Sequence, residues 1–435
     1  MNAAIDFLQE LIRFSPGKRE PSMPLSGDTP DSELSARMNS FTRDDWTQFE
    51  NLLRTNMISC FVFHRLKSHG LEKILPADLA NRLSKSYLIN AGRNLRFFGE
   101  IVKMAKAFHA EGIPIIVLKG NHLTRKVYEN IALREMVDID ILVRKSDAKR
   151  AFAIAHKNGY IPNKDFQIEN MELLSNHFDL KPKNGISFEI HWNIRVRDPQ
   201  IPCLPIDRFW SRASKEVFGD AEVFLFSVED LLLHLCFHAV YHHRLLRLDC
   251  RTLIDIASIL SKYSDSFNWD MFIKEAEIPG FRRAVLLCLK LSHDLLGTPV
   301  PKYVWEKLGL TLECESVVEA LKENFFVQET LENDVTVIKN KFCFQQAQIQ
   351  PTPLRKLKYY LRPFFPPWPE LARHFGVSQA SPFIFRFYVR RSIELLGKYM
   401  RTVLKIARDG NLQNNLHQKL EDKDTLENWI LEMEK

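Results

Sequence analysis

The chain has 435 residues, of which 45% are hydrophobic and 26% charged, and this usage is ordinary for a globular protein. It excludes disordered and fibrous classes, and the length predicts two or three packed units. The 60 basic residues exceed the 54 acidic ones by a formal charge of only +6. That excess is too small to indicate a nucleic-acid-binding protein by itself.

The cysteine pattern and the apolar segments indicate the cellular compartment of the protein. The seven cysteines are scattered without a CxxC pair, which argues against a disulfide framework and indicates a reducing compartment. Asp6 and Glu10 lie where a signal peptide would need a basic start followed by an unbroken apolar stretch. The most apolar later segment, 223–241, is interrupted by Glu229 and Asp230. We therefore expect no membrane span and a cytoplasmic protein.

The first hundred residues have a helical pattern. Residues 15–35 are rich in Pro, Gly and Ser, which predicts a loop after a short first helix. Apolar residues then recur at three- and four-residue spacing and predict helices over 45–67, 77–90 and 92–110.

The pattern changes at Ile113, where IPIIVL is a short apolar run rich in β-branched residues and predicts a buried strand. A helix over 121–130, a strand over 137–143 and a helix over 146–158 follow, with Gly159 as the expected cap of the last helix. This is a β-α-β-α succession.

Two later segments, HFDL at 177–180 and ISFEIHW at 186–192, alternate polar and apolar residues. Asn184 and Gly185 lie between them and favour a hairpin turn. The predicted sheet is therefore mixed.

Helical periodicity returns at Val228 and continues to about residue 408, apart from an irregular connector at 363–369. The predicted fold class is α/β (α+β): a core with a mixed sheet embedded between two helical regions. The expected boundaries are a helical N-terminal region at 1–94, the core at 95–222 and a large helical C-terminal region at 223–435.

Two carboxylates share one face of the strand at 137–143, because residues two apart in a strand point the same way. These are Asp138 and Asp140. The residues expected to face the core are Val137, Ile139, Ile141 and Val143. A divalent cation such as Mg²⁺ would relieve the repulsion between the two carboxylates across about 7 Å. The alternative is that Asp-x-Asp is a solvated strand end.

The same alternation in FEIHW separates Glu189 and His191 from an apolar face. That apolar face consists of Phe188, Ile190 and Trp192. If this strand pairs beside 137–143, Glu189 becomes a third carboxylate, and the patch could hold two metal ions about 4 Å apart for phosphoryl transfer. Otherwise Glu189 and His191 simply lie on the solvent-exposed face of an antiparallel strand.

The turn from Leu118 to Asn121 leads from a buried strand into a helix, where backbone N–H groups could receive phosphates. Lys119 would add a point charge, and Gly120 and Asn121 complete this candidate nucleotide-binding turn. Arg134 lies just before the acidic strand, where its guanidinium could bind a phosphate through two hydrogen bonds.

The succession GIPIIVLKG, REMVDIDILV, a helix ending in NGY, HFDL and FEIHW resembles the bacterial family called uncharacterised nucleotidyltransferases, a branch of the DNA polymerase β-like superfamily. The helical lead-in with Trp46 and the later LLLHLCFHAVYHHRLLRLDCRTLIDIA also resemble that family. The resemblance covers most of residues 40–270 and, more loosely, the rest.

The resemblance implies a nucleoside triphosphate donor, ATP above all, two Mg²⁺ or Mn²⁺ ions, an acceptor hydroxyl and release of pyrophosphate. By motif match it gives Asp138 and Asp140 the metal-ligand places and Glu189 the place of the third carboxylate. The chain departs from the wider superfamily at the turn, where Gly followed by Gly or Ser is replaced by Gly120 followed by Asn121. Seventeen residues separate Gly120 from Asp138, and we expect the helix and loop between them to shape a different donor pocket.

His234, His238 and His242 recur every four residues and would share a helix face. They form either a polar face turned toward the cleft, which makes His238 a candidate for nucleotide binding, or a zinc site. His191, on the strand at 186–192, is a similar candidate for nucleotide binding. Asp255 lies among apolar residues, and the sequence predicts a structural ion pair with a nearby arginine. The two candidates one turn or two before it are Arg247 and Arg251.

The role of one segment and two alternatives to the nucleotidyltransferase interpretation remain open at this stage. The basic aromatic stretch at 354–365 is either an amphipathic helix with its aromatic side chains packed inward or a surface for RNA or a membrane. The chain could be a catalytically silent nucleotide-binding or antitoxin-like protein with the same fold. An RNA-end-modifying enzyme is the third possibility, although the modest charge does not lead us to expect a nucleic-acid partner. A protein partner or protein acceptor stays open.

Overall fold

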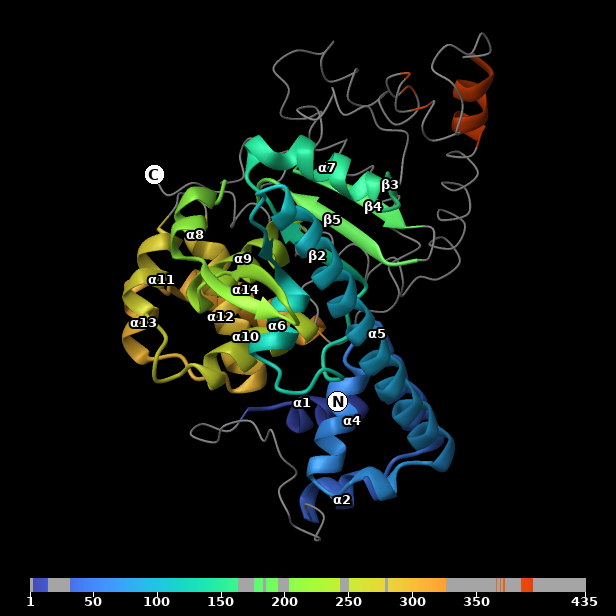
Figure 1. Cartoon of the computed structure of the whole chain (residues 1–435). Coiled ribbons are helices and arrows are strands. Elements are labelled where there is room, and N and C mark those ends of the chain that lie inside the picture. Colours follow the sequence, from blue (N-terminus) through green and yellow to red (C-terminus); the bar gives the residue numbers. More distant parts are fainter. Residues whose placement is uncertain are drawn as a thin grey trace. The chain divides into compact units, whose positions relative to one another are not determined.

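The computed structural model describes residues 3–14, 32–162, 176–182, 185–194, 203–242, 250–277, 281–325, 365, 368, 371 and 385–393. The chain divides into two compact units, residues 1–326 with 429–435 and residues 327–428. The sheet and the candidate site belong to the first unit (Figure 1). The predicted connector at 363–369 and the basic aromatic stretch at 354–365 lie almost wholly outside the described residues, as does most of the loop predicted over 15–35.

The N-terminal region is helical, as predicted. Its helices are α1 (Ala3–Leu11), α2 (Ser32–Asn39), α3 (Arg43–Thr55), α4 (Ser59–Ser68), the short η1 (Glu72–Ile74) and α5 (Ala77–Ala110). The helix predicted over 45–67 is two helices, because the chain turns at Met57, which has a positive φ of 53°. The two helices predicted over 77–90 and 92–110 are one, since a single Gly92 inside a long helix costs only about 1 kcal/mol.

The sheet has seven strands in the order β3-β4-β5-β2-β1-β7-β6. Their bounds are β1 (Ile116–Val117), β2 (Asp138–Leu142), β3 (Tyr160–Pro162), β4 (His177–Pro182), β5 (Ser187–His191), β6 (Ser214–Phe218) and β7 (Ala221–Leu225). The pairs β2–β5 and β1–β7 are parallel, and the other neighbours are antiparallel. The mixed sheet and the β4–β5 pairing predicted from the alternating segments are confirmed.

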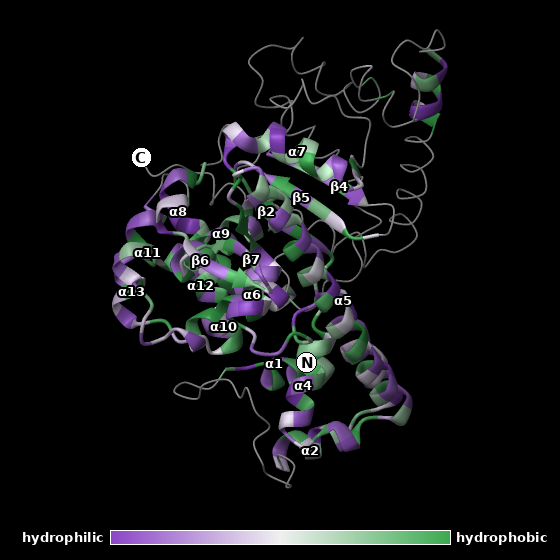
Figure 2. Cartoon of the chain, in the orientation of Figure 1, coloured by the Kyte–Doolittle hydropathy of each residue, from purple (hydrophilic) through white to green (hydrophobic). Residues whose placement is uncertain are grey.

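One face of the sheet is apolar and packs against helices. Ile139, Ile141, Phe188 and Ile190 of β2 and β5 are fully buried there. They form one core with α5 and with α7 (Ala148–Lys157), which follows the short η2 (Lys145–Asp147). Figure 2 shows α5 banded with hydrophobic and hydrophilic residues along its length, as expected for a helix with one buried face. The opposite face of β2 and β5 is left for polar side chains.

Val137 departs from the prediction that it faces this core. Its side chain is 58% exposed, because β2 begins only at Asp138 and Val137 still belongs to the preceding loop. The alternation that places Ile139 and Ile141 inward therefore does not extend to it. Gly159 has a φ of +88° directly after α7, as expected for the residue that ends a helix in the left-handed region.

Three short strands were not predicted. They are β3, β6 and β7, and β7 lies parallel to β1. The sheet therefore reaches Leu225, beyond the end expected for the core at residue 222. Likewise, α5 crosses the boundary expected between residues 94 and 95.

Helices follow the sheet, as predicted. They are α8 (Ile206–Arg212, before β6), α9 (Val228–Phe237), the π-helical η4 (His238–His242), α10 (Cys250–Lys262), α11 (Trp269–Ala276), α12 (Arg282–Leu296), α13 (Lys302–Lys307) and α14 (Leu312–Asn324). Among the helices that the structure describes, none is both long enough and apolar enough to cross a bilayer. The cysteines in the described part of the chain are free thiols.

Candidate active site

The polar face of the sheet gathers acidic side chains from two neighbouring strands. In the parallel pairing of β2 with β5, Asp140 lies directly opposite Glu189. Asp138 lies two residues before Asp140 on β2 and therefore on the same face. The structure thus brings together the three carboxylates singled out in the sequence, and the condition that β5 pairs beside β2 is met.

Asp140 is the centre of this group. Its side chain is only 5% exposed, and its Oδ1 lies 3.1 Å from Lys119 Nζ and 2.9 Å from His191 Nε2. The same His191 Nε2 lies 3.2 Å from Glu189 Oε2. Lys119 and His191, both nucleotide-binding candidates from the sequence, are therefore in direct contact with the carboxylates.

The charged groups of the site alter one another's pKa values. Burial would raise the pKa of Asp140, but Lys119 and a hydrogen bond from His191 outweigh it and hold that pKa well below its usual value. Burial would also lower the pKa of Lys119, but Asp140, Glu189 and Asp138 raise it instead. Burial together with the neighbouring charge of Asp140 raises the pKa of Asp138 to about 7. Burial and Asp140 therefore disfavour the charged form of Asp138 to an extent that the nearby cations do not fully offset.

The turn after β1 brings the chain close to this group. Helix α6 (Lys119–Lys126) begins directly after β1, and Lys119 has a positive φ of 42° at the junction. The helix was expected over 121–130 and begins two residues earlier. Leu118 donates its backbone N–H to the Asp140 carbonyl at 3.0 Å, which ties the turn to β2.

The space around Gly120 is crowded by two side chains, which would have to move to admit a larger residue. A Cβ at this position would lie 2.6 Å from Arg134 Nη1 and 2.7 Å from Met136 Sδ, closer than non-bonded atoms approach. The backbone of the turn therefore packs directly against the Arg134 guanidinium. Asn121, next to it, is 1% exposed and donates to the Asp138 carbonyl at 3.4 Å. Its buried Oδ1 has no hydrogen-bond partner among the described residues.

Arg134 forms a bidentate ion pair with Asp255 of α10. The Nε–Oδ1 and Nη2–Oδ2 distances are 2.9 and 2.7 Å, and the side chains are 10% and 1% exposed. Tyr128 also donates its hydroxyl to Asp255 at 2.7 Å. The structural ion pair predicted for Asp255 exists, and the partner that the structure describes is Arg134, which was not among the candidates. Arg251 instead donates to the Glu135 carbonyl, and Arg247 lies outside the described residues.

Helix α5 fixes the loop before β2 from the other side. The Asn90 amide donates to the carbonyls of Ala132 and Arg134, and the Asn94 amide donates to those of Ile131 and Arg134. Both asparagines are buried. Arg134 is thus held through its backbone by α5 and through its guanidinium by α10.

Two residues near the carboxylates were not singled out in the sequence. His177 lies opposite His191 in the β4–β5 pairing, and Asp179 lies opposite Glu189. His177 Nε2 is 3.9 Å from Glu189 Oε2. The signal for them was available, since the HFDL alternation combined with the hairpin turn places both on the face that carries Glu189.

His238, also a nucleotide-binding candidate, lies where α9 gives way to η4, with its ring 6.4 Å from that of His234. The π-helical turn changes the four-residue spacing on which the shared histidine face was predicted. A role of His238 in nucleotide binding stays a prediction. The side chain of His242 lies outside the described residues.

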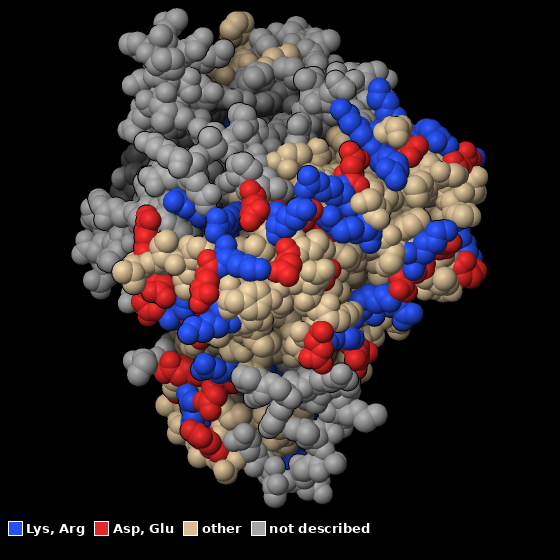
Figure 3. Space-filling view, turned by 90° about the vertical axis from the view of Figure 1, so that its left-hand side faces the viewer, with Lys and Arg blue, Asp and Glu red and all other residues tan. Residues whose placement is uncertain are grey.

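One face of the molecule shows how its charge is distributed. Figure 3 shows Lys and Arg intermixed with Asp and Glu over the described part of that face. This agrees with the small difference between 60 basic and 54 acidic residues in the chain.

A mixed sheet with adjacent carboxylates on one face and helices on the other is compatible with enzymes that handle phosphates through divalent cations. The model of the family described as uncharacterised nucleotidyltransferase matches residues 42–297. The chain belongs to this family. The match includes the whole sheet and α10, which carries Asp255.

Comparison with solved structures finds the CCA-adding enzyme of Thermotoga maritima, in its complex with tRNA_CCA. It is 10% identical, with a TM-score of 0.19, and the match covers 72% of this chain and 85% of that one. No curated protein matches the chain.

Proposed function

We propose that the protein is a metal-dependent nucleotidyltransferase that transfers a nucleoside monophosphate from a nucleoside triphosphate to an acceptor hydroxyl. The observation that carries this proposal is the register of β2 with β5, which sets Asp140 opposite Glu189 with Asp138 on the same face. Membership of the nucleotidyltransferase family supports the general reaction.

The donor set fits divalent cations. Carboxylate oxygens are the ligands that Mg²⁺ and Mn²⁺ prefer, and Asp138, Asp140 and Glu189 offer them from adjacent strands. Burial and Asp140 raise the pKa of Asp138, and a cation bound beside it would stabilise its charged form. When bound there, the ions would supply charge stabilisation for the triphosphate and for the attacking oxygen.

In the proposed reaction the acceptor oxygen bonds to the α-phosphorus, and the bond from that phosphorus to the bridging oxygen breaks. Pyrophosphate leaves with the bonding electrons, and the hydroxyl proton passes to a carboxylate of the group. Lys119 lies beside Asp140 and would steady the negative charge that develops. Arg134, whose guanidinium is paired with Asp255 and packs against the Gly120 turn, would hold that turn in place to receive the phosphates of the donor.

The test is release of pyrophosphate from each of the four nucleoside triphosphates, with Mg²⁺ or Mn²⁺ and a panel of sugar, metabolite, peptide and protein acceptors. We expect ATP to be the best donor. Asp140→Asn should lower the rate more than about 100-fold, since loss of even an indirect partner of a metal ligand costs 10- to 100-fold. Asp265→Asn, at an exposed position, is the matched control and should retain full activity.

Tight nucleotide binding without turnover across the whole acceptor panel would contradict the proposal. It would favour instead a silent nucleotide-binding protein with the same fold.

A further inference from the structure

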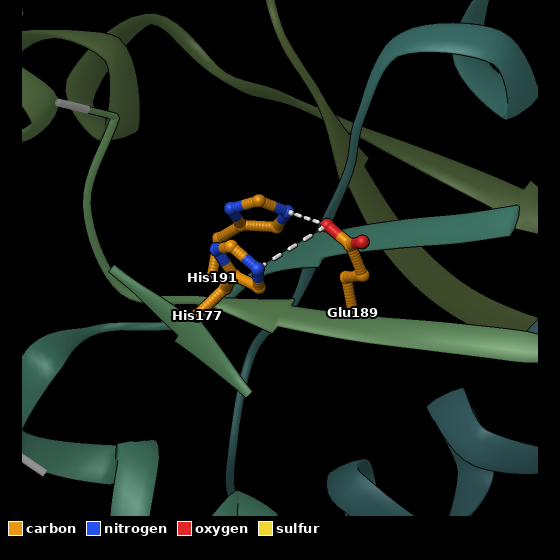
Figure 4. A group of neighbouring side chains, drawn as sticks. All are labelled: His177, Glu189 and His191. Atoms are coloured by element: carbon orange, nitrogen blue, oxygen red, sulfur yellow. Dashed lines mark ion pairs between the residues drawn. The ribbon is translucent and has the colours of Figure 1, made fainter. Parts of the chain in front are cut away.

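Three side chains on the polar face of the sheet converge on one point. His177 of β4 and Glu189 and His191 of β5 each offer a ligand atom, and these atoms all lie within 4.8 Å of one another. Figure 4 shows both imidazoles directed at the same carboxylate oxygen of Glu189. The strand register fixes this convergence, because His177 lies opposite His191 and Glu189 lies two residues before His191 on the same face.

The spacing of these atoms is close to that around a bound cation but somewhat wider. Nitrogen and oxygen ligands lie about 2.0–2.2 Å from a zinc ion, so two ligand atoms of a tetrahedral site are roughly 3.4 Å apart. Glu189 Oε2 lies 3.2 Å from His191 Nε2 and 3.9 Å from His177 Nε2. Asp140 Oδ1, 2.9 Å from the same nitrogen of His191, is close enough to serve as a fourth ligand. Small side-chain movements would complete the site.

Hydrogen bonding accounts for only part of this arrangement. The contacts of His191 with Asp140 and Glu189 are ordinary hydrogen-bond distances. His177 Nε2, however, aims at the same Glu189 oxygen from 3.9 Å, which is too long for a hydrogen bond. The side chains of His177 and Glu189 are 24% and 22% exposed, so an ion could reach them from solvent.

We propose that His177, Glu189 and His191 form a binding site for a divalent first-row transition ion that favours imidazole ligands, Zn²⁺ above all, next to the Asp138–Asp140 pair. Imidazole nitrogen is a good ligand for transition ions, whereas Mg²⁺ strongly prefers oxygen. The site therefore discriminates between metals where an all-carboxylate site would not. It shares Glu189 with the proposed active site, but its existence does not depend on nucleotidyl transfer.

The test is a titration of the chelator-treated, full-length protein with Co²⁺ alone, followed by its visible absorption. We expect one ion per chain with the intense absorption of a low-coordinate site, displaced by Zn²⁺ but not by a large excess of Mg²⁺. His177→Gln should weaken Co²⁺ binding at least about 10-fold. His109→Ala, an exposed histidine at the end of α5, is the matched control and should bind as the unaltered protein does.

Two further variants keep the outcome decisive. Asp138→Asn removes a carboxylate of the proposed active site that is outside the histidine site, and Co²⁺ binding should persist. His177→Asp replaces an imidazole by a carboxylate and should shift the metal preference of the site from Zn²⁺ toward Mg²⁺. Thermal unfolding checks that each variant is folded. Unchanged Co²⁺ affinity in folded His177→Gln, or displacement by Mg²⁺, would overturn the proposal. Absence of pyrophosphate release from the unaltered protein, with its Co²⁺ binding intact, would count against the proposed function alone.

Discussion

Gly120 lies closer to the charged groups of the site than any side chain would permit. Its Cα faces Arg134 and Met136, and a methyl group would overlap both. At the residue scale, the glycine is therefore a consequence of close packing rather than of backbone conformation. The same packing fixes where the guanidinium lies relative to the turn.

We predict that Gly120→Ala destabilises the protein by about 1–3 kcal/mol, because the neighbours of an overpacked site must shift. Chemical denaturation measures the effect. Gly99→Ala in α5 is the matched control, since a Cβ there meets nothing within 4 Å and alanine is favoured over glycine in a helix by about 0.5–1 kcal/mol. Equal effects of the two substitutions would show that the contact with Arg134 does not constrain the turn.

His122 of α6 supplies a second prediction at this scale. It is 2% exposed, and burial, with a smaller contribution from Lys126, lowers its pKa from 6.5 to about 3. The unfolded chain therefore binds one more proton than the folded one between these values. The free energy of unfolding should fall by up to about 1.4 kcal/mol per pH unit as the pH drops below about 6.5.

Denaturation of the unaltered protein and of His122→Gln at a series of pH values from 7 down to about 4 measures this contribution. The unaltered protein should lose stability relative to the variant as the pH falls. Parallel pH profiles would mean that His122 is protonated in the folded state.

At the scale of elements, α5 and α10 hold the loop before β2 between them. Asp255 of α10 pairs with Arg134 inside the protein, and Lys262 of the same helix pairs with the exposed Glu129 at 3.2 Å. The two pairs thus join the same helix to the same loop at different depths.

This contrast makes a comparison of two single substitutions, one in each pair, informative. Asp255→Ala should cost about 3–5 kcal/mol, because it leaves the Arg134 charge buried without its carboxylate partner. Lys262→Ala should cost no more than about 1 kcal/mol, as is usual for an exposed ion pair. If urea denaturation gives the same value for both substitutions, the buried pair does not organise the loop.

Much of the site follows from the two-residue period of strands. The alternation in VDIDILV and FEIHW predicted which side chains of β2 and β5 face the core, and Ile139, Ile141, Phe188 and Ile190 are buried as expected. The same reasoning failed at Val137, because periodicity does not show where a strand begins.

The parts that could not be predicted depend on contacts between distant segments. Arg134 and Asp255 are 121 positions apart, and no local pattern pairs them. The strand β6 is largely exposed and has only one buried residue, so its sequence lacks the apolar alternation that reveals a strand. The face that His177 shares with Glu189 could be predicted from alternation, but its position directly opposite His191 required the register of β4 with β5.

At the scale of the whole molecule, the charge balance bears on the kind of acceptor. A formal charge of +6 over 435 residues gives little of the counterion release that drives binding to nucleic acid. We predict micromolar or weaker affinity for single-stranded RNA near 150 mM salt, with a shallow dependence on salt. Fluorescence anisotropy with a labelled oligonucleotide measures both. Nanomolar affinity that falls steeply with salt would favour an RNA-end-modifying enzyme.

The central claim is that Asp138, Asp140 and Glu189 together hold divalent cations against the triphosphate of a nucleotide. The most direct measurement is a crystal structure with Mn²⁺ and a non-hydrolysable ATP analogue, in which anomalous scattering locates the manganese. We predict manganese peaks in contact with both the carboxylates of β2 and the phosphates, with the triphosphate beside Lys119. A bound analogue whose phosphates lie away from β2, with no manganese at Asp138 or Asp140, would contradict the account.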